Sequence, residues 1–120
     1  MDHDWSPCKI IDYSAFLSED DMDHRYGLLF DEFGPTQAFL EAQGFMAGGY
    51  TWHGIVESMI RAQDPAMGKE LDFDPESSMF CVRSSNIDVL KLAHDCISRA
   101  IADEKILQKA IDTADPLIME

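Results

Sequence analysis

The clearest pattern of apolar and polar residues along this chain lies between residues 52 and 63. Apolar side chains recur there at intervals of three and four residues, which places them on one buried face of a helix: Trp52, Ile55, Val56, Met59 and Ile60. The hydroxyl of Thr51 is suited to cap the start of this helix. Pro65 predicts that the helix ends near Gln63. We expect Trp52 to be a core aromatic residue rather than an anchor for a partner.

The segment that follows has the pattern of a β-hairpin. Apolar and acidic residues alternate strictly over residues 70–74, which predicts a strand with Leu71 and Phe73 facing the core and the acidic side chains facing out. Residues 74–77 suit a type I turn, with Asp74 first and Pro75 second. Residues 79–82 predict the second strand, and we expect a loop slightly longer than the tightest kind.

The first third of the chain predicts two more strands. Residues 8–17 are rich in β-forming residues, and four of them are available to a core: Ile10, Ile11, Tyr13 and Phe16. Residues 26–30 predict the second of these strands, which Gly27 either weakens or bends into a bulge. The first eight residues are expected to be loose, and residues 18–23 form an acidic turn.

A short helix is predicted over residues 36–43, with Phe39 and Leu40 buried. Pro35 suits the first turn of that helix, and Gly44 suits its C-terminal cap.

The last third of the chain is predicted to be helical. Ser85 or Asn86 caps a helix over residues 86–101, whose wide apolar stripe predicts packing across a sheet. Residues 103–113 form either a separate helix or a kinked extension. Pro116 stops it, and the tail beyond is expected to be frayed.

These elements predict an α+β fold, in which a small, mainly antiparallel sheet packs against several helices. A chain of 120 residues is long enough to bury one core, so we expect a single domain over residues 1–120.

Two motifs in this chain resemble the immunity protein 51 family of bacterial polymorphic toxin systems. An aromatic-glycine turn opens the first helix, and a hairpin of the pattern F-D-x-E-x-x-M-F follows it. The residues that carry these motifs are Gly49, Tyr50, Trp52, Phe73, Asp74, Glu76, Met79 and Phe80. The resemblance extends over residues 39–100. It implies an α+β domain that binds and neutralises a cognate toxin, delivered by contact-dependent growth inhibition or by secretion, and it leaves the toxin unidentified.

The charge of the chain narrows its possible partners. It carries 23 acidic and 9 basic residues, a formal net charge of −14. Phosphates and anionic membrane surfaces repel such a protein, which argues against binding to nucleic acids or membranes. The charge favours a basic partner, such as a nuclease toxin with a positive substrate-binding surface. The alternative, that the acidity serves solubility alone, remains open at this stage.

Two groups of acidic residues are the candidate contacts with a toxin. The first group consists of Glu19, Asp20, Asp21, Asp23, Asp31 and Glu32. The second group consists of Glu70, Asp72 and Glu76. Asp74 is left out of the second group because we expect it to close the turn before Pro75.

The sequence has no recognisable motif for catalysis, metal binding or cofactor binding. The four histidines have no ligand spacing with one another or with cysteine. The acidic residues that begin at Asp72 lack the glycine and glutamate of a calcium-binding loop. We therefore expect neither an enzyme nor a bound cofactor, and the sequence does not indicate an oligomeric state.

The cysteines and the hydropathy indicate a cytoplasmic location. Cys8, Cys81 and Cys96 have no CxxC spacing and lie in apolar surroundings, which is typical of buried free thiols in a reducing compartment. No apolar run approaches the length of a membrane span, and the chain does not begin with a basic, apolar signal peptide.

Two other classes of function remain open. One is an acidic interaction or adaptor domain with no toxin partner. The other is a small ligand-binding domain that uses a pocket near Trp52 and His53.

Overall fold

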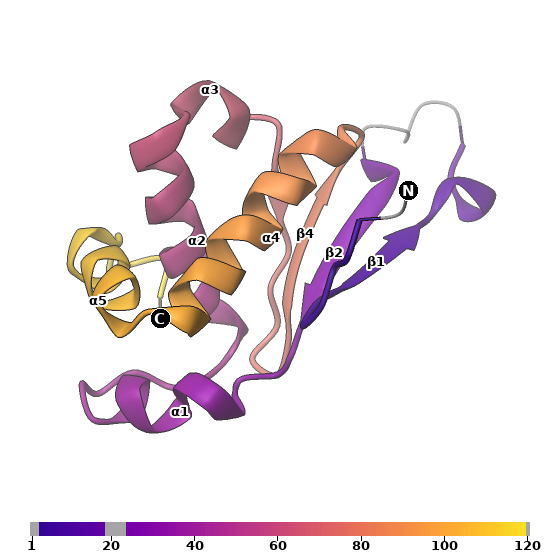
Figure 1. Ribbon diagram of the computed structural model, residues 1–120. Helices are drawn as coiled ribbons and strands as arrows, with labels where there is room; N and C mark the ends of the chain where they lie inside the picture. The colour runs from indigo at the N-terminus through magenta and orange to yellow at the C-terminus, as the bar shows by residue number, and fades with distance from the viewer. Residues whose placement is uncertain (1–2, 19–23, 120) are drawn as a thin grey trace.

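The computed structural model describes residues 3–18 and 24–119, which fold into an antiparallel sheet and a layer of helices (Figure 1). The strands are β1 (Lys9–Asp12), β2 (Tyr26–Phe30), β3 (Asp72–Phe73) and β4 (Phe80–Ser84), in the order β1-β2-β4-β3. The helices are α1 (Gly34–Glu41), α2 (Gly49–Gln63), α3 (Pro65–Gly68), α4 (Ile87–Ala102) and α5 (Glu104–Thr113), and a short 3₁₀ turn, η1 (Ser14–Phe16), follows β1. This architecture confirms the predicted α+β fold.

One face of the sheet is apolar and lies against the helices. Leu28 pairs with Val82 and Phe30 pairs with Phe80 in the register of β2 and β4, and all four side chains are buried. Because side chains alternate across a strand, the residues between these positions point to the opposite face.

The long helices form a layer over that apolar face (Figure 1). α4 contacts β2 and β4, as its wide apolar stripe predicts, while α2 contacts α4 and β4, and α5 packs against α2 and α4. The side chain of Asn86 accepts the backbone N–H of Asp88 and caps α4. Asp103 has extended backbone angles and caps α5 in the same way, so α5 is a separate helix rather than an extension of α4.

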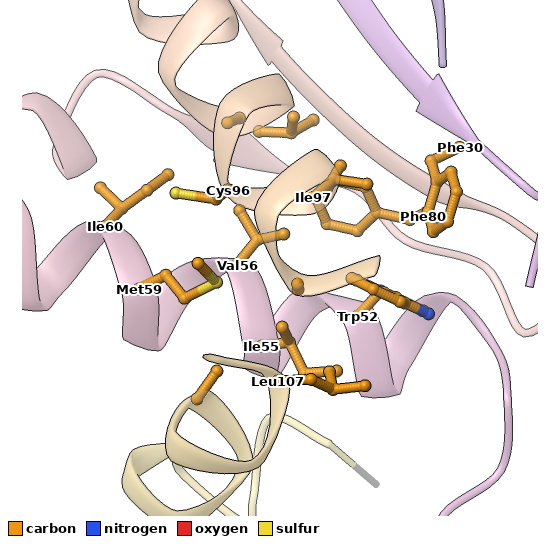
Figure 2. Close-up of a cluster of buried hydrophobic side chains, with 14 of the residues drawn as sticks. Phe30, Trp52, Ile55, Val56, Met59, Ile60, Phe80, Cys96, Ile97 and Leu107 are labelled. Atoms are coloured by element: carbon orange, nitrogen blue, oxygen red, sulfur yellow. The ribbon is translucent and has the colours of Figure 1, made fainter. Parts of the chain in front are cut away.

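Trp52 of α2 lies at the centre of the core (Figure 2). Its side chain is fully buried, and its ring meets that of Phe30 edge to face, with centroids 4.9 Å apart. Ile97 of α4 and Leu107 of α5 are buried in the same cluster. The structure therefore confirms that Trp52 is a core residue.

The hairpin of β3 and β4 is antiparallel as predicted, but its turn lies two residues later. Glu76 and Met79 bond to each other through their backbones, which leaves a tight loop of Ser77 and Ser78. The predicted turn at Asp74 is wrong because the strand register continues through it. Pro75 is tolerated there because β3 is an edge strand, where a missing N–H leaves no ladder bond unmade.

Two local predictions fail near the starts of elements. α2 begins at Gly49, so Thr51 lies inside the helix and does not cap it. β1 ends at Asp12, whose carboxylate accepts the backbone N–H of Ser14 and turns the chain into η1. Phe16, at the end of η1, is therefore 84% exposed and does not join the core.

Both ends of the described chain dock on the core rather than lying loose. Trp5 packs against the core, and the backbone carbonyl of Ser6 accepts a hydrogen bond from Nε2 of His94 at 2.9 Å. At the other end, Met119 is buried over α2. A Cβ on Gly54 would overlap the side chain of Met119, so this glycine makes room for the tail.

The start of α2 is in direct backbone contact with the tip of the hairpin. The N–H of Gly49 bonds to the carbonyl of Ser77 at 3.3 Å. A Cβ on Gly49 would overlap the carbonyl oxygens of Glu76 and Met79, and a Cβ on Gly48 would overlap that of Ser77. These two glycines are required by the close approach of two backbones.

We predict that Gly49→Ala lowers the free energy of unfolding by about 3 kcal/mol, because the new methyl group forces α2 away from the hairpin tip. The measurement is urea denaturation followed by circular dichroism. Gly34→Ala is the matched control, because nothing lies within 4 Å of a Cβ at that position. Equal stabilities of the two variants would show that the contact between α2 and the hairpin is not tight.

Candidate functional site

The face of the sheet that the helices leave uncovered is the candidate site (Figure 1). Leu29 of β2 pairs with Cys81 of β4 on this open face, and Ile11 of β1 points the same way. Leu29 and Ile11 are partly exposed, so the open face has a partly apolar centre.

Three carboxylates line the edge of this open face. The register runs unbroken from the pair Asp72–Arg83 to the pair Glu76–Met79, so every second residue points the same way. The residues concerned are Asp72, Asp74 and Glu76, all of them exposed, and we call them the acidic row. Alternation alone could have placed Asp74 in this row, but it was left out because a turn was expected there.

The charge of the acidic row affects the pKa of the Cys81 thiol. Burial raises the pKa of this thiol to about 11, with a further increase from Asp74, Glu76 and Asp72. Arg83, on the same strand, acts in the opposite direction. All three carboxylates therefore lie close enough to the thiol to raise its pKa.

One end of the acidic row is fixed by neighbouring side chains. Oδ2 of Asp72 lies 2.7 Å from Nε2 of His24, and the guanidinium of Arg83 donates to the backbone carbonyl of His24 at 2.8 Å. The same guanidinium lies 4.3 Å from the centre of the Tyr13 ring. A Cβ on Gly27 would lie 2.7 Å from that ring, so Gly27 makes room for Tyr13 and does not form a bulge.

The other predicted contact residues are more dispersed. Glu70 accepts a hydrogen bond from the side-chain amide of Asn86 at 3.3 Å, beside the start of α4. Asp31 and Glu32 are exposed and follow β2, at the same end of the sheet as Glu76. The predicted contacts outside the described residues are Glu19, Asp20, Asp21 and Asp23.

The two sequence motifs pack against each other. Phe73 of β3 stacks on His53 of α2, with ring centroids 4.3 Å apart and planes 22° apart. The neighbouring Trp52 is fully buried, so its indole cannot reach a ligand, whereas Tyr50 remains 41% exposed. The motifs therefore build the fold and present one aromatic side chain at the surface.

The cysteines of this protein are buried side chains of the core. The three cysteines are buried and free, as predicted, and burial raises the pKa of Cys8 and Cys96 to about 12. Within residues 3–18 and 24–119, no three or more histidine, cysteine or acidic side chains are grouped to hold a metal ion. In the same part of the chain, no helix has the length and apolarity that crossing a membrane requires.

We predict that the folded protein loses stability through His53 as the pH falls below about 6.5. Burial lowers the pKa of His53, and the nearby charge of Glu57 opposes this only in part. His53 therefore takes up a proton more readily in the unfolded chain than in the folded one. The stabilising effect is present above the ordinary pKa of 6.5 and is lost at lower pH.

Urea denaturation across this pH range should therefore show a steeper loss of stability for the wild type than for His53→Phe. That variant keeps a ring against Phe73 and cannot titrate. Identical pH dependences of the two proteins would contradict the assignment to His53.

Comparison with known proteins adds one finding. The family model described as immunity protein 51 matches residues 15–116, which is most of the chain. Searches of the curated proteins and of the solved structures gave no match.

Proposed function

Because the chain belongs to the immunity protein 51 family, we propose that it binds a cognate toxin domain and neutralises it through the acidic row. Family membership supports an immunity function and a toxin as partner. The observation that carries the finer proposal is the acidic row itself. Asp72, Asp74 and Glu76 project from an edge strand on a face of the sheet that the helices leave open.

The toxin that fits this surface is basic. With a net charge of −14, the protein attracts a positive surface from a distance and speeds the encounter. A nuclease carries such a surface because it must hold a polyanion, and carboxylates that occupy it exclude the substrate. We therefore propose a nuclease toxin that is inhibited by blocked substrate access.

The distribution of basic residues favours the sheet side for this contact. Arg61, Arg99 and Lys109 line a hollow between α2, α4 and α5, and no acidic residue lines it. Arg61 is paired with Glu57 and Arg99 with Asp95, so this hollow carries little net charge and attracts a positive toxin surface less than the acidic row does.

The proposed inhibition needs binding alone. It requires no catalytic residue, metal or cofactor, and it takes place in the cytoplasm, where a nuclease toxin meets its nucleic acid substrate. Delivery of the toxin by contact-dependent growth inhibition or by secretion is equally compatible with this mechanism.

We predict that the double variant Asp74→Lys/Glu76→Lys binds the toxin at least about tenfold more weakly than the wild type. Each substitution places a like charge against the positive toxin surface, and losing one partner of a desolvated pair costs about 2–5 kcal/mol. The measurement is biolayer interferometry with a catalytically inactive toxin domain from the neighbouring gene, together with rescue of growth from the active toxin.

Asp95→Lys/Asp112→Lys is the matched control, because it makes the same change in net charge on α4 and α5. We expect it to slow association slightly and to lose that effect between roughly 0.1 M and 1 M salt. Equal losses of affinity in both double variants would show that overall charge matters and that the acidic row is not the contact.

A further inference from the structure

The exposed apolar residues of this protein gather beside the hairpin tip. Among the described residues, the large hydrophobic side chains that stay exposed are Phe16, Met46, Tyr50 and Leu117. Met46 precedes α2, Tyr50 lies in the first turn of α2, and Leu117 lies in the turn that docks over α2 at the end of the chain. Three of the four therefore belong to segments that meet at one place.

A hollow of about 570 Å³ lies where these segments meet, and Met46 and Tyr50 line it. The opposite wall consists of Pro116 and Met119 from the terminal turn, and Ser77 from the hairpin tip lines it as well. None of its lining residues is charged. Its volume is in the range of sites that bind a large side chain or a small ligand.

The hollow and the acidic row meet at the hairpin tip, on opposite sides of it. Ser77, which lines the hollow, directly follows Glu76, the last residue of the row. On the opposite wall, Asp115 precedes Pro116, and its carboxylate accepts the backbone N–H of Leu117 at 3.0 Å. The uncharged hollow thus follows an acidic residue in the chain at both the hairpin tip and the terminal turn, and an apolar centre with polar surroundings is the arrangement of a protein interface.

We propose that this hollow anchors the toxin by accepting one of its apolar or aromatic side chains, while the acidic row contacts basic residues of the toxin on the other side of the hairpin tip. The proposal rests on the proposed function and adds a second, apolar part to the toxin-binding surface. Exposed tyrosine and methionine are enriched in protein interfaces, and a few buried aromatic contacts carry most of the binding energy. The net charge of −14 favours a basic partner for this surface.

A second copy of the same chain fits this hollow less well. Two copies would each carry a net charge of −14 and would repel each other as they approach. This repulsion opposes self-association and leaves a basic protein as the matching occupant.

The test is the affinity of Tyr50→Ala and Met46→Ser for the inactive toxin domain. We expect Tyr50→Ala to bind about 30-fold more weakly, as is typical when an aromatic anchor is truncated, and Met46→Ser to show a smaller loss in the same direction. Phe16→Ser is the control, because Phe16 is also an exposed large apolar residue but lies outside the hollow, and it should bind like the wild type.

Salt separates the two parts of the surface. The loss caused by Tyr50→Ala should persist between roughly 0.1 M and 1 M salt, because it is apolar, whereas the loss caused by Glu76→Lys should shrink. Both variants change exposed side chains, and unchanged circular dichroism spectra would show that they fold.

The outcomes distinguish this inference from the proposed function. If the wild type binds no toxin, the proposed function fails and this inference fails with it. If the wild type binds and both hollow variants bind as tightly, the inference alone is overturned. If analytical ultracentrifugation shows a dimer of the wild type that Tyr50→Ala dissociates, the occupant is a second copy, and the inference is again overturned.

Discussion

The contact between the start of α2 and the hairpin tip fixes where α2 lies against the sheet. Backbone touches backbone there, and only Gly48 and Gly49 allow so close an approach. The contact sets Trp52 beside Phe30 in the core, so α2 is held at both its start and its buried face. It also joins the two surfaces proposed for the toxin, because the acidic row ends on one side of the tip and the hollow opens on the other.

Much of the fold could be predicted from the sequence because periodicity reports burial directly. The apolar stripes of α2 and α4 and the alternation in β3 each correspond to a face that lies against the core. The hairpin turn was misplaced because Asp74 and Pro75 have the local chemistry of a turn, yet the pairing with β4 continues past them. The strand pairing overrides the local turn preference of these two residues. Pro75 is compatible with the pairing because β3 is the edge strand of the sheet.

The parts that could not be predicted depend on contacts between distant segments. Trp5 is a single apolar residue among polar ones, and Met119 ends an apolar run of three residues that is too short for periodicity to show which of them docks on the core. The acidic row follows from alternation within five residues, so sequence reasoning came close to it. The hollow brings together residues near 46, 77 and 116, and no local pattern in the sequence indicates that these segments meet.

The edge strand β3 also bears on the resistance of the protein to aggregation. An open sheet edge offers unpaired backbone groups to any other extended chain, and this is a common route to aggregation. Here the edge strand has only two residues, Pro75 offers no N–H at the open edge, and three like charges line it. The charges proposed to attract a toxin thus also oppose edge-to-edge pairing between copies of the protein, so the same carboxylates would serve both binding and resistance to aggregation.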